Sequence, residues 1–212
     1  MRVFIFGSTS DITFSLIDLY RDQEVVTINR KDKIFSKIRE NKIGDYFQDD
    51  DIVIYLSSIL YSKRIETQTE DEIFNSCFVN AISPIKIIKH LNKHVANFTF
   101  CYISSESAKK GSFDDSYHIF KGAVDNFIRE FSLTSSKSRI FCIAPSTIDS
   151  GMTKRRKDVE RLNEYRVNHP MQRFISANEI ANIIYTLCTE KFSYLSNTIV
   201  EINGGKYARN RY

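Results

Sequence analysis

The sequence predicts a single α/β domain built on a doubly wound parallel sheet. Short apolar runs rich in Val, Ile and Phe alternate with longer amphipathic segments, the pattern of parallel strands joined by crossover helices. With 212 residues, 42% of them hydrophobic, the chain can form one core and does not require a second domain. No internal repeat or low-complexity linker divides it. We therefore expect one domain over residues 1–212.

The individual elements follow from length, periodicity and flanking residues. Strands are expected where short apolar runs are rich in β-branched and aromatic residues, at 2–6, 24–29, 51–57, 98–104, 139–143 and 198–202. Helices are expected in the amphipathic segments between them, at 11–20, 33–40, 69–92, 116–133 and 177–189. Pro84 should kink the longest helix, and Ser176 or Asn178 should begin the last one.

The least regular stretch is 145–175, which is charged and lacks clear periodicity. Open α/β sheets bind ligands beyond the carboxyl ends of their strands, and this stretch follows the last central strand. We therefore expect residues 150–175 to form a substrate lid. The basic run 154–157 within it is either a solvated surface or a sign that the substrate is anionic, for example phosphorylated.

Composition narrows the classes of partner and compartment. The formal charge of +4 is mild, and acidic residues are interleaved with basic ones, which favours a small anionic ligand over nucleic acid. The four cysteines are scattered without a CxxC pair or clustered histidines, so we expect reduced thiols and no metal site. The sequence shows no signal-peptide pattern and no membrane-length apolar run. These features predict a cytoplasmic protein.

The first strand runs directly into a turn and then a helix. In this layout backbone amides and the helix dipole hold the pyrophosphate of a dinucleotide. The predicted contacts are Gly7, Ser8, Thr9, Ser10, Asp11 and Ile12. Such turns usually carry three glycines, whereas only Gly7 remains here, and Asp11 places a carboxylate near the phosphate position. The turn is therefore either a cofactor site or an ordinary strand-to-helix turn.

The second strand ends at Asn29 and Arg30, where an acidic side chain would bind the ribose hydroxyls of NAD. A guanidinium suits a 2′-phosphate instead, because its planar donor fork binds phosphate in a bidentate way. This predicts a preference for NADP(H), with NAD(H) as the alternative. The simpler reading is a solvated Arg30 beside Asp32.

Several motifs occur in a fixed order along the chain. Tyr117 and Lys121 are four residues apart and so share one helix face. The strand before them ends in Ser104 and Ser105, and Asn80 lies in the long helix further upstream. The runs 143–153 (IAPSTIDSGMT) and 203–205 (NGG) follow downstream. With these motifs in this order and spacing, the sequence resembles the short-chain dehydrogenase/reductase family nearly end to end.

This resemblance implies a Rossmann-like fold and a catalytic group. The family's YxxxK motif falls on Tyr117 and Lys121, its serine on Ser105 with Ser104 as the alternative, and its active-site asparagine on Asn80. It implies that Tyr117 exchanges a proton with the substrate, that the Lys121 charge favours the phenolate and holds the nicotinamide ribose, and that Asn80 anchors a water linking Lys121 to solvent. The other implied cofactor contacts are Ser57, Ser58, Pro145, Ile148 and Ser150.

The sequence also departs from the family. Between Arg30 and Tyr55 there is room for one helix but hardly for the family's third strand and its helix, so we expect that strand to be shortened or missing. The expected function is an NADP(H)-dependent oxidoreductase acting on a small carbonyl or alcohol. The alternatives are a 3-oxoacyl carrier protein reductase, a nucleotide-sugar reductase, and a catalytically silent relative with a binding or regulatory role.

Relatives of this family self-associate, so the resemblance also implies a homodimer or homotetramer. The interface would use helices 69–92 and 116–133, with an apolar surface formed by Phe74, Phe78, Phe127 and Phe131. Burial of these rings within the monomer is the alternative.

Overall fold

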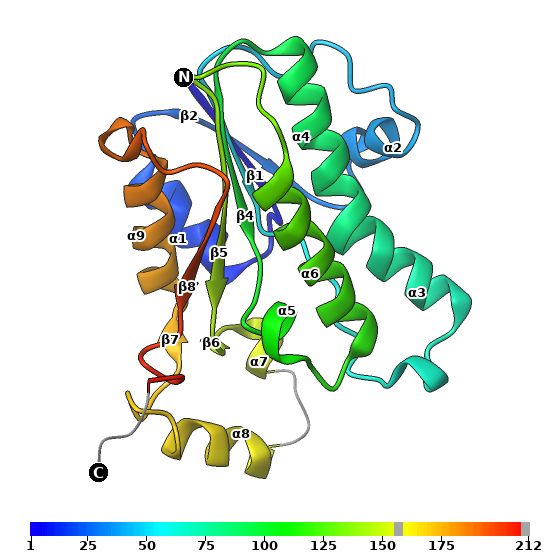
Figure 1. Cartoon of the computed structure of the whole chain (residues 1–212), viewed down its shortest axis with the longest axis vertical. Helices are drawn as coiled ribbons and strands as arrows, with labels where there is room; N and C mark the ends of the chain where they lie inside the picture. The colour runs from blue at the N-terminus through cyan, green and yellow to red at the C-terminus, as the bar shows by residue number, and fades with distance from the viewer. Residues whose placement is uncertain (155–158, 209–212) are drawn as a thin grey trace.

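The computed structural model describes residues 1–154 and 159–208. Its centre is a six-stranded parallel sheet in the order β2-β1-β3-β4-β5-β8 (Figure 1). The strands are β1 (Arg2–Phe6), β2 (Glu24–Ile28), β3 (Asp51–Tyr55), β4 (Phe98–Ile103), β5 (Arg139–Pro145) and β8 (Thr198–Ile202). All six lie where the sequence predicts them, and the α/β doubly wound fold is confirmed.

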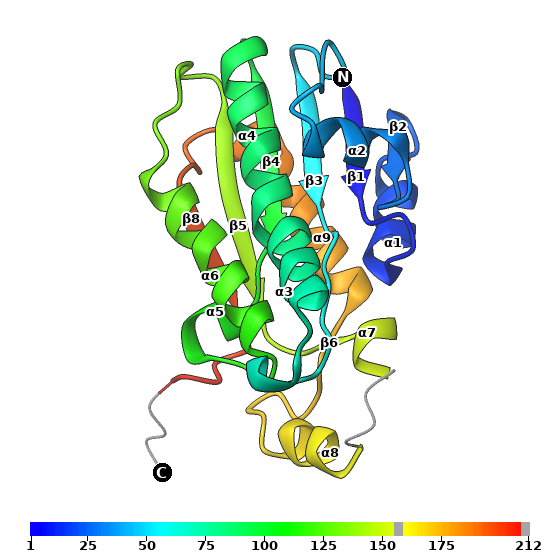
Figure 2. The ribbon, with the colours of Figure 1, turned by 90° about the vertical axis from the view of Figure 1, so that its right-hand side faces the viewer.

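Helices cover both faces of the sheet (Figures 1 and 2). Helices α1 (Asp11–Leu19) and α9 (Ala177–Cys188) pack against each other on one face. The other face carries α2 (Lys33–Arg39), α3 (Glu70–Cys77), α4 (Ser83–His94) and α6 (Asp115–Glu130). The shorter helices are η1 (Ile65–Thr67), α5 (Ser107–Lys110) and η3 (Glu190–Phe192). Because both faces are covered, the central strands are buried along nearly their whole length.

The core consists of two apolar clusters, one on each side of the sheet. Alternate side chains of one strand enter opposite clusters, so Phe4 and Phe6 of β1 join one and Val3 and Ile5 join the other. The period of two along each strand therefore fixes which helix face each side chain meets. This alternation fixes the register of the strands, and with it the edge of the sheet at which they end.

The sheet ends at β2, with no strand beyond it among the described residues. After α2 the chain passes directly to β3, which pairs with β1 through Val3 and Ile52. The sequence prediction that the family's third strand is missing is therefore confirmed. The segment that would carry it holds only α2 and a connecting loop.

The helix predicted over 69–92 is interrupted. Residues Phe78–Ile82 (η2) form a π-helical turn between α3 and α4, just before Pro84. Proline has no N–H, so the Asn80 carbonyl cannot receive the usual helical bond. The Tyr102 hydroxyl donates to that carbonyl instead at 2.6 Å, and the Tyr55 hydroxyl donates to the neighbouring Val79 carbonyl at 2.7 Å. The kink expected at Pro84 is thus a π-turn stabilised by two buried tyrosines.

The expected lid contains more regular structure than its sequence predicts. It holds β6 (Ile148–Asp149), α7 (Gly151–Lys154), α8 (Val159–Val167) and β7 (Ile175–Ser176), with β6 and β7 paired. Helix α8 lies beyond the carboxyl edge of the sheet and buries none of its residues, so it has no apolar stripe to produce a helical period (Figure 2). Of the basic run, Lys154 pairs with Asp149 at 3.6 Å, and 155–157 lie outside the described residues.

Three of the four phenylalanines expected at a subunit interface are used inside the monomer. Phe78, Phe127 and Phe131 pack against the larger core cluster, whereas Phe74 is 71% exposed. Self-association through these helices stays a prediction.

The remaining expectations concern the cysteines, membrane-spanning helices and metal sites. All four cysteines are free thiols, and three of them are buried. In the two described ranges, 1–154 and 159–208, no helix has the length and apolar character needed to cross a membrane. The same ranges hold no group of His, Cys, Asp and Glu side chains arranged to bind a metal ion.

Candidate active site

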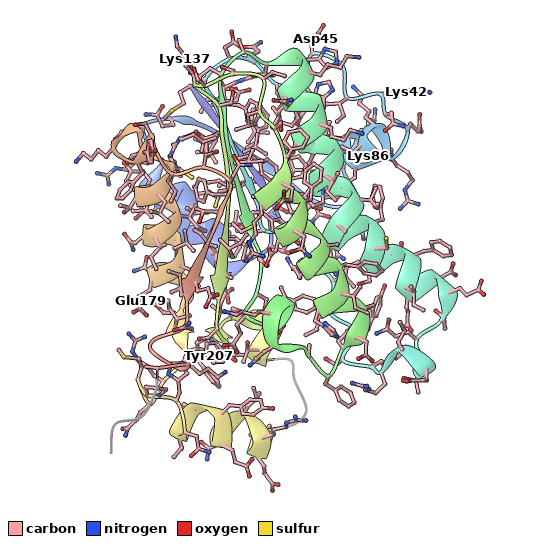
Figure 3. All side chains as sticks on the ribbon, in the orientation of Figure 1. Lys42, Asp45, Lys86, Lys137, Glu179 and Tyr207 are labelled. Atoms are coloured by element: carbon pink, nitrogen blue, oxygen red, sulfur yellow. The ribbon has the colours of Figure 1, made fainter. Side chains whose placement is uncertain are left out.

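A cleft of about 1770 Å³ lies at the carboxyl ends of the strands. Figure 3 marks this end of the molecule by Glu179 and Tyr207, and the opposite end by Asp45 and Lys137. The residues that line the cleft include every predicted cofactor contact: Gly7, Ser8, Thr9, Ser10, Asp11, Ile12, Asn29, Arg30, Ser57, Ser58, Tyr117, Lys121, Pro145, Ile148 and Ser150. Ser104 and Ser105 also line it. Six separate segments of the sequence therefore converge on one site.

The turn between β1 and α1 is shaped by its single glycine. Gly7 has a φ of +118°, and a Cβ there would meet the Ser57 backbone nitrogen at 3.1 Å, so any larger residue would clash. Thr13 donates its hydroxyl to the Gly7 carbonyl at 2.7 Å, and Ser10 caps α1. The N–H groups of the turn are mostly bonded within the protein, and among residues 7–14 only those of Thr9 and Asp11 are left for a ligand.

Asp11 is tied to the lid. Its carboxylate accepts a hydrogen bond from the Gly151 N–H at 2.8 Å, at the start of α7. The side chain therefore joins two segments that are 140 residues apart in the sequence. The carboxylate lies in the first turn of α1, as the sequence indicates, and it is the one feature of the turn that opposes a bound anion.

Arg30 is exposed and lines the cleft at the end of β2, so both the solvated reading and a phosphate contact stay open. Asp32 accepts from the Asn29 N–H at 2.7 Å, which closes the turn after β2. The positive charge of Arg30 lowers the pKa of Tyr61, which also lines the cleft, against the larger effect of burial. A guanidinium in this position is available to an anionic ligand.

Tyr117 lies in the first turn of α6 and faces the cleft. Burial raises its pKa, while hydrogen bonds to the hydroxyls of Ser105 and Ser58 lower it by less. The phenol is therefore protonated at neutral pH, which suits a proton donor. The Ser104 hydroxyl lowers the pKa of buried Asp125 against the larger effect of burial. Of the two candidate serines, Ser105 is the one that affects the pKa of Tyr117, and its choice as the catalytic serine stays a prediction.

Lys121 is 1% exposed and donates to the Ile103 carbonyl at 2.6 Å. Its ammonium lies 4.4 Å from the centre of the Tyr102 ring. Burial lowers the pKa of Lys121 to about 7, against smaller opposing effects of Asp125 and Cys142. Burial therefore reduces the charge of Lys121 and also keeps the Tyr117 phenol protonated. That the Lys121 charge favours the Tyr117 phenolate, as the family resemblance implies, stays a prediction.

Asn80 lies behind the cleft and is fully buried. Its side-chain oxygen accepts from the Ser58 hydroxyl and the Ile59 N–H, each at 2.9 Å. Its amide group donates to the Ile59 carbonyl at 2.9 Å and to the Ser76 hydroxyl at 3.0 Å. All four hydrogen-bonding positions of the side chain are filled. The Asn80 side chain therefore fixes the loop that carries Ser58, and the water-anchoring role that the resemblance implies for Asn80 stays a prediction.

Comparison with known proteins shows to which family this arrangement belongs. A family model described as enoyl-(acyl carrier protein) reductase matches residues 33–206. The chain belongs to the short-chain dehydrogenase/reductase family. The matched range covers most of the chain but leaves out the turn from Gly7 to Asp11, where the sequence departs most from the family pattern.

Two named relatives are about 25% identical to this chain over the aligned residues. An uncharacterized oxidoreductase, YgfF, of Escherichia coli K12 is 25% identical over 158 residues, which is 63% of this chain and 64% of that protein. The 3-oxoacyl-[acyl-carrier-protein] reductase FabG of Chlamydia trachomatis is 24% identical over 208 residues, covering 92% of this chain and 76% of the relative. The chain thus spans just under two thirds of the length of the Escherichia coli protein.

Solved structures of the family have the same fold. A short-chain dehydrogenase family protein of Francisella tularensis has a TM-score of 0.82 at 18% identity, covering 98% of this chain and 99% of that one. A Brucella melitensis structure, titled short-chain dehydrogenase/reductase SDR:glucose/ribitol dehydrogenase, has a TM-score of 0.81 at 17% identity, covering 98% and 97%. The divergent turn and the missing strand therefore leave the family fold intact.

The residues present fit the dinucleotide that the family implies, with one departure. The Ser57 hydroxyl is buried beside the Gly7 turn with no hydrogen-bond partner among the described residues, so it is free to bind a ligand. The turn amides would hold the pyrophosphate, Arg30 the adenosine ribose, and Lys121 the nicotinamide ribose. Asp11 is the departure, because its carboxylate lies where the phosphates would approach.

Sequence reasoning missed part of the cleft wall. Residues 59–64, which follow β3, line the cleft and have no periodicity from which a role could be predicted. Arg161 and Tyr165 of α8 also line it, and they lie within the stretch that the sequence predicts as a lid. One signal could have found the anchor of the loop 59–64, since Asp114 stands three residues before Tyr117, at the position of a helix cap.

Proposed function

We propose that this chain transfers a hydride between NADP(H) and a small carbonyl or alcohol substrate, with Tyr117 as general acid and base. The observation that carries the proposal is that Ser105, Tyr117 and Lys121 line one cleft, with Lys121 one helical turn after Tyr117 on α6. A serine and a tyrosine hydroxyl in one cleft can provide a hydrogen-bond donor and a proton donor for a single substrate oxygen.

The nicotinamide supplies the hydride when it is bound. In the reduction direction Ser105 donates a hydrogen bond to the substrate carbonyl oxygen, and Tyr117 gives that oxygen its proton. The raised pKa of Tyr117 keeps the proton in place until charge develops on the oxygen. Lys121, whose pKa is about 7, exchanges a proton readily at neutral pH and stabilises the phenolate that Tyr117 leaves behind.

The preference for NADP(H) over NAD(H) rests on Arg30. It lines the cleft at the end of β2, and Asp32 is occupied by the Asn29 N–H. A charge-assisted bond to a 2′-phosphate is available there, and the residue at this position is a cation and not the acidic side chain that would bind the two ribose hydroxyls of NAD.

A second candidate is reduction of a 3-oxoacyl group on a carrier protein. It is supported by relatives named 3-oxoacyl-[acyl-carrier-protein] reductase, among them FabG of Chlamydia muridarum, 29% identical over 159 residues and covering 74% of this chain and 60% of the relative. The run from Pro145 to Thr153 resembles that subfamily. Comparing the rate on a carrier-bound 3-oxoacyl thioester with the rate on the same acyl group attached to a small thiol separates the two candidates.

The test of the proposed function is a fluorescence titration with NADPH and with NADH. We expect saturable binding of both, with NADPH bound at least a few-fold more tightly. Equal affinities would refute the assigned preference, and no binding of either would refute the proposed hydride transfer itself. The proposal includes a cytoplasmic homodimer or homotetramer, for which sedimentation at micromolar concentration is the direct check.

A further inference from the structure

The loop after β3 forms one wall of the cleft without support from the sheet. Residues 59–64 line the cleft and have no regular secondary structure, and Ser62 adopts a positive φ of 56°. Backbone N–H groups in such a loop need partners outside it. The loop and Tyr117 line the same cleft.

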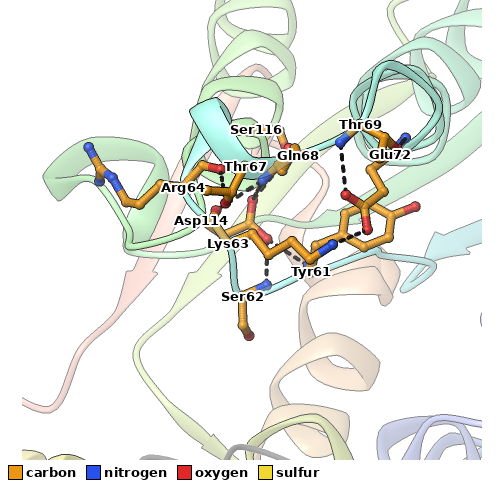
Figure 4. A network of polar contacts seen from close by, with 10 residues as sticks. All are labelled: Tyr61, Ser62, Lys63, Arg64, Thr67, Gln68, Thr69, Glu72, Asp114 and Ser116. Carbon is orange, nitrogen blue, oxygen red and sulfur yellow. Dashed lines mark hydrogen bonds and ion pairs between the residues drawn. The ribbon is translucent and has the colours of Figure 1, made fainter.

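One carboxylate supplies two of those partners, while the Ile59 N–H donates to Asn80. Asp114 is 1% exposed, and its Oδ2 accepts from the backbone N–H groups of Tyr61 at 2.6 Å and Ser62 at 2.9 Å (Figure 4). Hydrogen bonds to a buried carboxylate are strong because the acceptor is charged. The loop is therefore held at its middle by a side chain from another element.

The second oxygen of Asp114 holds the catalytic helix. Oδ1 accepts from the Tyr117 N–H, the Ser116 hydroxyl and the Gln68 amide, each at 3.0 Å. Asp114 is thus the N-cap of α6, and its bond to the Tyr117 backbone fixes the first turn of that helix. The two oxygens therefore have different roles, since Oδ1 positions Tyr117 and Oδ2 positions the loop 59–64 that forms the facing wall of the cleft.

We propose that Asp114 is a positioning residue that sets the distance between Tyr117 and the loop 59–64, and thereby sets the affinity for substrate. This inference rests on the proposed function, because it assigns the loop to the substrate side of the same cleft. In this proposal Asp114 does not itself contact the reacting atoms. Its effect passes through Tyr61 and Ser62, whose N–H groups it holds.

Asp114→Asn separates the two roles of the side chain. The amide oxygen of asparagine can keep the cap on α6, while its NH₂ group would face the N–H groups of Tyr61 and Ser62, donor against donor. The loop should be released and the helix start kept. Lys63 and Arg64 follow directly, so trypsin reports on the release. We expect cleavage there to rise by at least about tenfold, since two charge-assisted bonds are lost and each one shifts an opening equilibrium by about tenfold or more.

The matched control is Asp51→Asn. Asp51 is also 1% exposed, and it also accepts from a backbone N–H, that of Gln48 at 2.7 Å, in addition to Arg2. It lies at the amino end of β3, away from the cleft. This variant lowers overall stability through the same substitution, so a general loss of stability would raise cleavage equally in both variants.

The expected result has three parts. Trypsin cleaves Asp114→Asn faster than Asp51→Asn at Lys63 and Arg64, the KM for a reduced carbonyl rises several-fold with kcat within about twofold, and the Kd for NADPH is unchanged. Equal cleavage in the two variants, or a fall in kcat at constant KM, would overturn the inference. If the wild-type protein reduces no carbonyl, the proposed function fails, and the cleavage comparison alone decides whether Asp114 anchors the loop.

Discussion

Replacing Lys121 by methionine should change how the stability of the protein depends on pH. Lys121 is fully buried, and burial lowers its pKa from the ordinary 10.5 to about 7. The unfolded chain therefore holds this proton more tightly than the folded protein does. By linkage, the free energy of unfolding must rise with pH wherever the unfolded state binds more protons, here between about pH 7 and 10.5.

The magnitude follows from the same pKa values. Each pH unit within that window is worth about 1.36 kcal/mol, so the wild-type protein should gain about 2 kcal/mol from Lys121 between pH 7 and pH 9. Below pH 7 the full destabilisation is present, about 4 to 5 kcal/mol as an order of magnitude. Lys121→Met also leaves the Ile103 carbonyl without its donor, a cost of about 1–3 kcal/mol that does not vary with pH.

The assay is urea unfolding at several pH values from 6 to 9. The difference in unfolding free energy between wild type and Lys121→Met isolates this one group, because other titrating residues are common to both proteins. We expect the difference to change by about 2 kcal/mol in favour of wild type between pH 7 and 9. An exposed control, Lys137→Met, should give no such change. Parallel curves for wild type and Lys121→Met would refute the assignment of a depressed lysine pKa.

Three further predictions concern the cofactor end and the π-turn. Arg30→Ala should weaken NADPH binding by about tenfold and leave NADH nearly unaffected, because only NADPH carries the 2′-phosphate, as fluorescence titration would show. Asp11→Gly should tighten NADPH binding by about fivefold, since it removes a like charge worth about 1 kcal/mol near the phosphates; unchanged affinity would mean that the Gly151 contact keeps the carboxylate clear. Tyr102→Phe should lower the free energy of unfolding by about 1–2 kcal/mol, because the Asn80 carbonyl loses its buried donor. A loss below about 0.5 kcal/mol would mean that this bond is replaceable.

The sequence was sufficient to predict the sheet because each strand is a short apolar run bounded by turn residues. The shortened interval between Arg30 and Tyr55 was enough to predict the missing strand, since a strand and a helix need more residues than it contains. Motif order brought the predicted cofactor residues to one cleft, because parallel strands place their following loops at a single edge.

Contacts between side chains distant in sequence could not be predicted in this way. The bond from Asp11 to Gly151 joins positions 140 residues apart, and no periodicity links them. The Tyr102 bond to Asn80 depends on a π-turn that only the three-dimensional structure reveals. The pKa of Lys121 depends on how deeply α6 packs against the sheet, which the motif alone does not specify.

The central claim is that Tyr117 is the proton donor of a hydride-transfer reaction, and Tyr117→Phe tests it most directly. The substitution keeps the ring and removes only the hydroxyl, so the fold and the binding of NADPH should be preserved. Turnover of a carbonyl substrate that wild type reduces should fall by about 10² to 10⁴, the contribution of general acid catalysis. A rate within about twofold of wild type, with NADPH still bound, would contradict the assignment of the site.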